Sequence, residues 1–219
     1  MRTLAFVTQK GGSGKSTIAS SLAVAAREAG ERVFILDMDP QQSLMKWAKA
    51  RKLNDIPVEA IQPGKISAVM NSLAKSGVTL CIIDTAGTES TATAAAMKAA
   101  DLCIIPARPN AFDLWASEMT RRTLRELRKD YVFLLNQCPP SQQNARIEEG
   151  VELLEKMGGL ISPLIGARVD YQEAARNGLG VTEWNASGLA AEEINKLWSS
   201  IKRRMAKGKS ASAPARRAA

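Results

Sequence analysis

The glycine-rich loop QKGGSGKST constrains this chain of 219 residues more than any other feature. It follows the apolar run TLAFV and precedes a segment with helical periodicity, and its glycines let consecutive backbone N–H groups turn towards one anion. Lys15 then reaches the β and γ phosphates of a nucleotide, and the Ser16 hydroxyl ligates Mg²⁺. An empty glycine turn would explain the glycines but not the adjacent lysine and serine. The loop therefore predicts a site for ATP and Mg²⁺, formed by Lys10, Gly11, Gly12, Ser13, Gly14, Lys15, Ser16 and Thr17.

Short apolar runs alternate with longer amphipathic segments after the loop, which is typical of repeated βαβ units. The predicted strands are residues 3–7, 32–37, 79–84, 101–106 and 131–136. Helices are predicted from Lys15, after Pro40, in the alanine-rich segment near residue 95, and near Ser117. The pattern predicts an α/β fold, with a doubly wound, mostly parallel sheet flanked by helices.

The ends of the predicted strands are rich in Gly, Pro and Asp. Ligands of open parallel sheets bind at the carboxyl ends of the strands, so residues dispersed in the sequence should converge there. The segments concerned are Thr8–Gly14, Asp37–Gln41, Asp84–Gly87, Pro106–Pro109 and Asn136–Pro140.

The length suits one domain with an appendage. Apolar residues at helical spacing predict a last helix that begins near Leu189 and passes Ile201. Beyond Met205 the chain is poor in apolar side chains and rich in Ala, Ser, Pro and basic residues. We therefore predict a P-loop domain over 1–206 and a disordered basic tail over 207–219.

Composition excludes several classes of mechanism. Histidine is absent, so an imidazole base and a His-ligated zinc are excluded. Cys81, Cys103 and Cys138 are scattered without CxxC spacing, which favours reduced, packed thiols over metal ligands or disulfides. No apolar run is long enough to cross a bilayer, and the N-terminus lacks the features of a signal peptide. We expect a cytoplasmic protein.

The loop departs from the common phosphate-loop pattern, because Gln9 stands where a glycine is usual and Lys10 follows it. This KGGxGK[ST]T form resembles the variant Walker A motif of the ParA/MinD family of P-loop ATPases. In that family the additional lysine reaches the nucleotide of a second copy. The resemblance therefore implies an ATP hydrolase that forms an ATP-dependent homodimer, with Lys10 and Lys15 both acting at phosphates. A solvated loop lysine is the alternative for Lys10.

Four further segments resemble the family in order along the chain. The last, PLIGARVDYQEAARNGLGVTEW, resembles the late family segment that lies near the base and the dimer face. RVFILDMDPQ resembles its DxDPQ element, which implies that Asp37 helps to hold the magnesium shell and Asp39 positions the attacking water. TLCIIDTAG resembles Walker B, which implies that Asp84 faces Mg²⁺ and that Thr85–Thr88 sense the γ phosphate. YVFLLNQ implies that Asn136 contacts the adenine ring. The two acids are equally compatible with a cap on the following helix, and Asn136 with a strand-end turn.

The net charge of +8 is concentrated near the C-terminus, since residues 202–219 carry seven Lys or Arg and no acid. Such charge suits non-specific binding to DNA phosphates. The predicted DNA contacts are Arg168, Arg176, Lys202, Arg203 and Arg204, with Lys207, Lys209, Arg216 and Arg217 in the tail. The series Arg121, Arg122, Arg125 and Arg128 could contribute, or could be a solvated helix face.

Size and the stretch IPARPNAFDLWA look most similar to short ParA proteins of the ParF type. The resemblance implies a nucleoid-associated ATPase whose dimer binds non-specific DNA and moves a plasmid, chromosome region or protein cargo. A ParB-like partner would stimulate hydrolysis and release. Two alternatives stay open: a MinD-like membrane-associated ATPase, for which WSSIKRRMAK offers little apolar area, and a metabolic P-loop enzyme acting on a small substrate.

Overall fold

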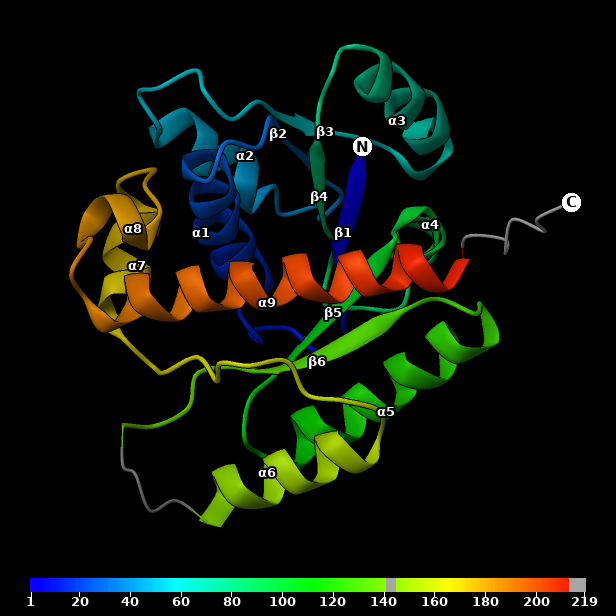
Figure 1. Cartoon of the computed structure of the whole chain (residues 1–219), viewed down its shortest axis with the longest axis vertical. Helices are drawn as coiled ribbons and strands as arrows, with labels where there is room; N and C mark the ends of the chain where they lie inside the picture. Colours follow the sequence, from blue (N-terminus) through cyan, green and yellow to red (C-terminus); the bar gives the residue numbers. More distant parts are fainter. Residues whose placement is uncertain (141–144, 213–219) are drawn as a thin grey trace, which may run out of the picture.

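A computed structural model describes residues 1–140 and 145–212 of the chain. Its strands form one sheet in the order β3-β2-β4-β1-β5-β6, and every pairing is parallel (Figure 1). The strands are β1 (Arg2–Phe6), β2 (Val33–Asp37), β3 (Val58–Ala60), β4 (Leu80–Asp84), β5 (Leu102–Ala107) and β6 (Tyr131–Leu135). This is the doubly wound α/β sheet that the sequence predicted.

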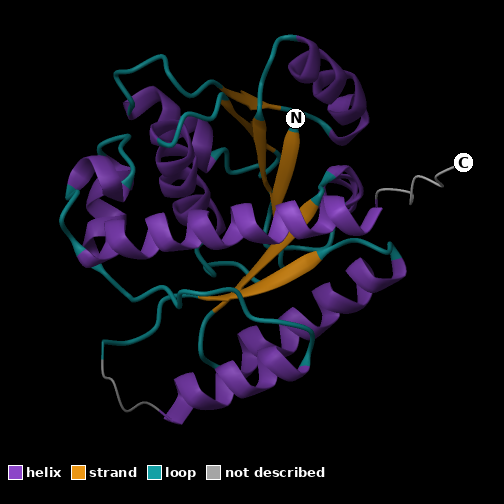
Figure 2. Ribbon diagram, viewed as in Figure 1, coloured by secondary structure: helices purple, strands orange, loops and turns teal. Residues whose placement is uncertain are grey.

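Helices cover both faces of the sheet (Figure 2). They are α1 (Lys15–Glu28), α2 (Ser43–Ala50), α3 (Ile66–Lys75), α4 (Thr91–Ala99), α5 (Ala111–Glu126), α6 (Ala145–Lys156), α7 (Val169–Arg176), α8 (Val181–Trp184) and α9 (Leu189–Ser212), with a short 3₁₀ turn η1 (Pro63–Lys65). One buried cluster joins a sheet face to α1, α2 and α7–α9, and a second joins the opposite face to α3–α6.

The central strand β1 fixes where the ligand loop lies. Phe6 pairs with Asp84 of β4 on one side and with Ile104 of β5 on the other. The chain leaves β1 between two carboxyl-terminal strand ends and enters α1, so the glycine loop occupies the middle of that edge (Figure 1). The apolar residues of β1, Leu4 to Phe6, are fully buried, as is Val7 directly after the strand; this is expected for a strand covered on both faces.

Several elements were not predicted from the sequence. β3 has three residues, and its Glu59 is exposed, so the segment lacks the apolar run that marks a buried strand. α3, α6, α7 and α8 were also missed. The last two are short. They pack on each other and on α1, and α8 also packs on α9, so tertiary contacts rather than their own periodicity stabilise them.

The predicted boundary of the tail has to be corrected. α9 begins at Leu189, as predicted, but it continues to Ser212 rather than ending near 206. Ala, Lys and Ser residues extend a helix whose first turns are already held by packing, because propagation costs far less than nucleation. Residues 213–219, including Arg216 and Arg217, lie outside the described residues. No helix in the described part of the chain is both long and apolar enough to cross a bilayer.

A buried arginine joins α2 to α8. The Arg51 side chain is 1% exposed, and its guanidinium donates to both oxygens of Asp55 and of Glu183 at 2.7–2.8 Å and to the Gly178 carbonyl at 3.0 Å. It also lies 5.3 Å from the centre of the Trp47 ring. This ion-pair cluster fixes the loop before α8 against the helix that follows Asp39.

We predict that Arg51→Met destabilises the fold by about 3 kcal/mol, because removing one member of a largely buried ion-pair cluster leaves the other charges without compensation. Urea unfolding measures this change. Lys196→Met is the matched control, since Lys196 pairs with Glu192 on the surface with its side chain 63% exposed. The control should cost under about 0.5 kcal/mol. Equal losses in the two variants would contradict the role given to Arg51.

Candidate functional site

The glycine loop forms an open cradle at the N-terminus of α1. Gly14 is the N-cap, with φ 90°, and a Cβ at this position would lie 2.3 Å from the Asn136 amide nitrogen. The backbone conformation therefore favours glycine here, and any larger residue would also have to displace the Asn136 side chain. Lys15 is 6% exposed, and its Nζ donates to the Lys10 carbonyl at 3.4 Å. The Ser13 hydroxyl is buried with no hydrogen-bond partner in the structure, so the cradle contains polar groups that a phosphate could satisfy.

The burial of Lys15 favours an anionic ligand. Burial lowers the pKa of Lys15, and the nearby carboxylates of Asp84 and Asp39 partly oppose that effect. A buried ammonium gains more from a phosphate than an exposed one, because water screens the interaction less. The lysine predicted to contact phosphates thus lies at the base of the cradle.

Ser16 and Asp84 converge as the magnesium role requires. Ser16 Oγ donates to Asp84 Oδ2 at 2.5 Å, and Asp84 Oδ1 is buried with no hydrogen-bond partner in the structure. Burial, followed by the negative charges of Asp37 and Asp39, raises the pKa of Asp84 to about 7, although Ser16 and Lys15 oppose the rise. A carboxylate with an unsatisfied oxygen beside a serine hydroxyl fits a hydrated Mg²⁺.

The rest of a magnesium shell would have to come from the nucleotide and water. In the described residues there is no group of three or more Cys, Asp or Glu side chains that could hold a metal alone. Mg²⁺ commonly binds through one or two protein ligands together with substrate phosphates. The residues present therefore fit Mg·ATP rather than a resident metal.

Asp37 and Asp39 have different surroundings. Asp37 is buried and accepts hydrogen bonds from the backbone N–H groups of Asp39, Leu44 and Met45 at 3.0–3.1 Å. These contacts match the helix-cap interpretation and position the loop that carries Asp39, so the magnesium role of Asp37 stays a proposal. Asp39 accepts from the Gln41 N–H at 2.9 Å and lines the same cavity as Lys15 and Ser16.

The segment after β4 packs directly on the glycine loop. Thr85 donates to the Phe6 carbonyl at 2.8 Å. A Cβ added at Gly87 would lie 2.6 Å from the Gly11 nitrogen and 2.8 Å from the Lys10 carbonyl carbon. The sequence predicts a switch over Thr85–Thr88 but does not predict the contact between the backbones of Gly87 and Gly11. Through this contact, a movement of the switch would be transmitted to the loop.

Two adjoining cavities could receive a nucleotide. The larger, of about 680 Å³, is lined by the loop, Asp39 and Gly87. Lys46, Gln172 and Arg176 also line it, and the sequence did not predict the first two of these. The smaller, of about 300 Å³, shares Gly14, Thr17 and Gln172 with it and is also lined by Asn136. Asn136 already donates to the Ser13 carbonyl at 2.7 Å. Its contact with adenine stays a prediction, and the smaller cavity lies beside it.

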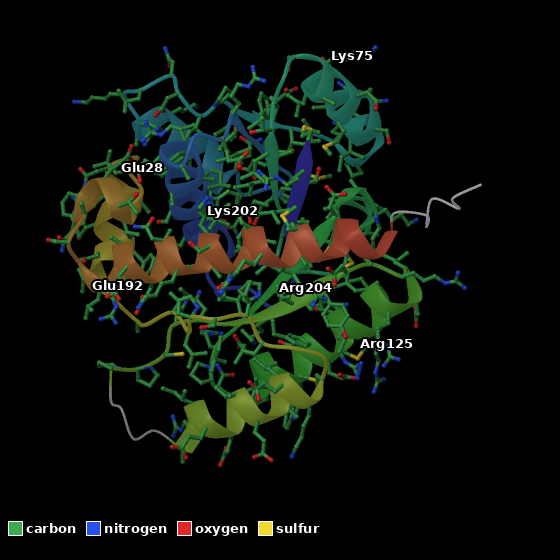
Figure 3. All side chains as sticks on the ribbon, viewed as in Figure 1. Glu28, Lys75, Arg125, Glu192, Lys202 and Arg204 are labelled. Atoms are coloured by element: carbon green, nitrogen blue, oxygen red, sulfur yellow. The ribbon has the colours of Figure 1, made fainter. Side chains whose placement is uncertain are left out.

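The five predicted DNA-contacting residues whose side chains the structure describes do not form one patch. Arg168 is paired with Glu193 at 2.7 Å beside the smaller cavity, and Arg176 lines the larger one. The other three lie on the second half of α9, roughly 20 Å along the helix from its start. Figure 3 shows Lys202 and Arg204 on opposite sides of α9, as expected for residues roughly 200° apart.

The α9 cations also differ in their contacts. Arg204 pairs with Asp130 at 2.5 Å, Arg203 donates to the Ser200 hydroxyl at 3.1 Å, and the Lys202 ammonium lies 5.5 Å from the Trp198 ring centre. The side chains of Lys207 and Lys209 lie outside the described residues. A count of charges could not reveal these different contacts.

Comparison with known proteins identifies the family. The model of the CobQ/CobB/MinD/ParA nucleotide binding domain matches residues 4–181, a span that includes the glycine loop, Asp39, Asp84 and Asn136. The chain belongs to this family. The chain is thus a P-loop ATPase of the ParA/MinD type.

Relatives agree with that assignment. The chain is 29% identical over 209 residues to the "Maintenance of carboxysome distribution protein A" of Halothiobacillus neapolitanus, covering 91% of this chain and 95% of that protein. Its fold is similar to apo McdA of Cyanothece, with a TM-score of 0.77 at 18% identity over 93% and 98% of the two chains. It is also similar to MinD of Pyrococcus horikoshii OT3 with Mg-ADP, with a TM-score of 0.73 at 18% identity over 94% and 98%.

We predict that Gly87→Ala in this ATPase weakens ATP binding by about tenfold or more while the fold persists, because backbone atoms cannot yield to the new Cβ as a side chain could. Titration with a fluorescent ATP analogue measures binding, and thermal unfolding checks the fold. Gly64→Ala is the control, since a Cβ there meets no atom within 4 Å. Unchanged affinity in the Gly87 variant would show that the switch and loop move independently.

The pKa of Asp84 predicts a pH dependence of the nucleotide-free protein. Because the folded pKa of about 7 exceeds the usual 3.8, the folded state binds the proton more tightly, and this stabilising effect is lost as pH rises towards 7. Asp84→Asn should therefore stabilise the protein more at pH 8 than at pH 5, measured by urea unfolding without Mg²⁺. Glu59→Gln, at an exposed site, is the charge-matched control. The same gain at both pH values would contradict the assignment.

Proposed function

We propose that this ATPase forms a dimer when it binds Mg·ATP, that the dimer binds DNA without sequence preference, and that a partner stimulates hydrolysis to release it. One observation carries the dimer. The larger cavity is lined by Gly11, Gly14, Lys15 and Ser16, whereas Lys10 is not part of its lining. This supports the proposal that the additional lysine serves a nucleotide other than the one in its own cavity.

Each remaining side chain has a task in the proposed site. Bound Mg²⁺ would neutralise charge on the β and γ phosphate oxygens. Ser16 and Asp84 would hold its shell, and Lys15 would contact the outer phosphates from the base of the cradle. Asp39 would orient the attacking water, because its carboxylate lines the cavity and its loop is fixed by Asp37. Since the water depends on one partly exposed carboxylate, unstimulated turnover should be slow.

Non-specific DNA binding is the proposed use of the cations. Arg176 is exposed at the rim of the larger cavity, and Lys202 and Arg203 lie on α9. Contact with phosphates needs charge but no base recognition, and each contact adds roughly 0.9 to the salt slope. The name of the Halothiobacillus relative supports a protein assembly as cargo, over a plasmid or chromosome region. Nucleoid association and a ParB-like stimulating partner are parts of the same proposal.

The membrane alternative is weakened by α9 itself. Trp198, Ile201 and Met205, the apolar residues that such a helix would insert, are at most 7% exposed and pack in the core. An amphipathic helix binds a bilayer only through apolar area that is available to it.

A metabolic reaction stays a second candidate because of one further cavity. It has a volume of about 530 Å³ and shares Asp39 with the nucleotide cavity, and Gln42, Gln62, Thr88 and Ser90 line it with polar groups. A small acceptor there would lie next to the proposed γ-phosphate position. Phosphate release to water alone, with no phosphorylated product in a metabolite mixture, would exclude this candidate.

Two substitutions test the nucleotide chemistry. Lys15→Ala should abolish productive ATP binding. Asp39→Ala should leave ATP bound while lowering hydrolysis on the order of a hundredfold or more, because only water positioning is removed. A fluorescent-nucleotide titration and a phosphate-release assay measure the two effects. Turnover close to wild type in the Asp39 variant would remove this residue from the mechanism.

DNA binding is tested by fluorescence anisotropy of a random-sequence duplex with Mg²⁺ and either ATPγS or ADP, at two salt concentrations. The expected result is salt-sensitive binding with ATPγS and little with ADP. Arg176→Gln should reduce the salt slope by roughly 1 per protomer, and Lys202→Gln with Arg203→Gln by roughly 2. Equal weak binding in both nucleotide states would reject nucleotide-gated DNA binding.

A further inference from the structure

An apolar stripe is exposed along α5. Phe112, Trp115 and Met119 are 69%, 64% and 49% exposed, and their spacing of three and four residues places them on one face of the helix. The rings of Phe112 and Trp115 meet edge to face, with centres 5.5 Å apart. The opposite face of α5 packs on the sheet through Leu114 and Leu124. The α5 stripe, defined as Phe112, Trp115 and Met119, therefore lies outside both buried clusters.

The stripe borders a hollow that a second protein surface could fill. Leu153 of α6, 39% exposed, faces the same cavity of about 470 Å³ as Phe112 and Trp115. Contiguous exposed apolar residues on soluble proteins commonly mark interaction sites. Trp, Phe and Met are the types enriched at the buried centre of protein interfaces.

The helix that carries the stripe contacts the phosphate loop. α5 begins just after β5, at the sheet edge where the loop lies (Figure 1). Thr120 of α5 accepts a hydrogen bond from the Gln9 N–H at 3.3 Å, next to Lys10. Arg108, paired with Asp113 in the first turn of α5, comes within 3.8 Å of the position of a Cβ on Gly12. The segment that presents Lys10 is thus attached to the helix that carries the stripe.

We propose that the α5 stripe is part of the surface through which two copies of this chain associate when ATP is bound, an inference that rests on the proposed dimer. A two-fold axis that brings Lys10 of each copy to the nucleotide of the other also brings the adjoining surfaces together. Stable interfaces bury about 800 Å² per partner, more than two glycine loops supply. The stripe adds apolar area at the required place.

The charges around the stripe favour a second copy over a strongly acidic or basic partner. Glu118 pairs with Arg121 at 2.9 Å and with Arg122 at 3.2 Å, and Glu149 lines the hollow. A border with both signs is self-complementary across a two-fold axis, because each acid can face a base of the other copy.

The test is sedimentation of the full chain with Mg²⁺ and ATPγS. Phe112→Ser combined with Trp115→Ser should raise the dimer Kd about tenfold or more, because buried aromatic anchors carry much of the energy of an interface. The binding of a fluorescent nucleotide to the monomer should stay within about twofold of wild type. Trp184→Ser is the matched control, because Trp184 is 41% exposed on α8, in the other helix layer, and should leave the Kd unchanged.

A second readout uses the tryptophans directly. Trp47 and Trp198 are at most 4% exposed, so iodide quenching in a Trp184→Phe chain reports mainly on Trp115. ATPγS should protect Trp115 at concentrations where the dimer forms, and ADP should not.

The outcomes are separable. Suppose that the wild-type chain dimerises with ATPγS, that the double variant dimerises equally, and that Trp115 stays accessible to iodide in the dimer of the Trp184→Phe chain. This result overturns the stripe while the proposed function stands. A double variant that dimerises normally but no longer responds to a hydrolysis-stimulating partner also overturns the proposed role of the stripe in dimerisation. It would show that the partner binds this surface instead. A wild-type chain that stays monomeric with ATPγS overturns the proposed function itself.

Discussion

The pairing of β1 between β4 and β5 is the constraint on which the site depends. It places the end of β1 level with Asp84 on one side and Ile104 on the other, so the loop leaves the sheet between the predicted Walker B strand and the strand that leads to α5. The loop then meets Asp84 through Ser16, Gly87 through Gly11, and Thr120 through Gln9. The end of β4, the predicted switch after it and α5 thus all contact the glycine loop.

This attachment costs stability that a ligand can restore. Asp84 keeps one buried oxygen without a partner, and burial disfavours the charged forms of both Asp84 and Lys15. The stabilising contacts lie elsewhere, in the two apolar layers and in the Arg51 cluster that anchors α2 to α8. A nucleotide with Mg²⁺ would offer opposite charges to both groups, so its binding would stabilise the folded protein.

Sequence reasoning located five strands within one residue at each end, because buried apolar runs are bounded by Gly, Pro and Asp. It located the phosphate loop because that motif is local. It missed β3, whose VEA has no apolar run, and placed the end of α9 too early, because helix propagation depends on packing upstream. Gln172 and the Gly87–Gly11 contact depend on segments far apart in the chain. No local pattern reports such contacts, and charge counts likewise could not show that Arg168 and Arg204 are paired with acids.

The distribution of the cations bears on how ATP could control DNA binding. Two of the five predicted contacts are already engaged by Glu193 and Asp130, and the remainder lie in two separate regions of one copy. Among the side chains that the structure describes, a single protomer therefore presents few of the predicted cations to any one stretch of DNA. Because log affinity rises with the number of phosphates neutralised, doubling the cations on one rigid particle raises affinity far more than twofold. In the proposed cycle, dimerisation alone is then sufficient to make DNA binding depend on ATP, and no conformational change within the DNA-binding surface is needed.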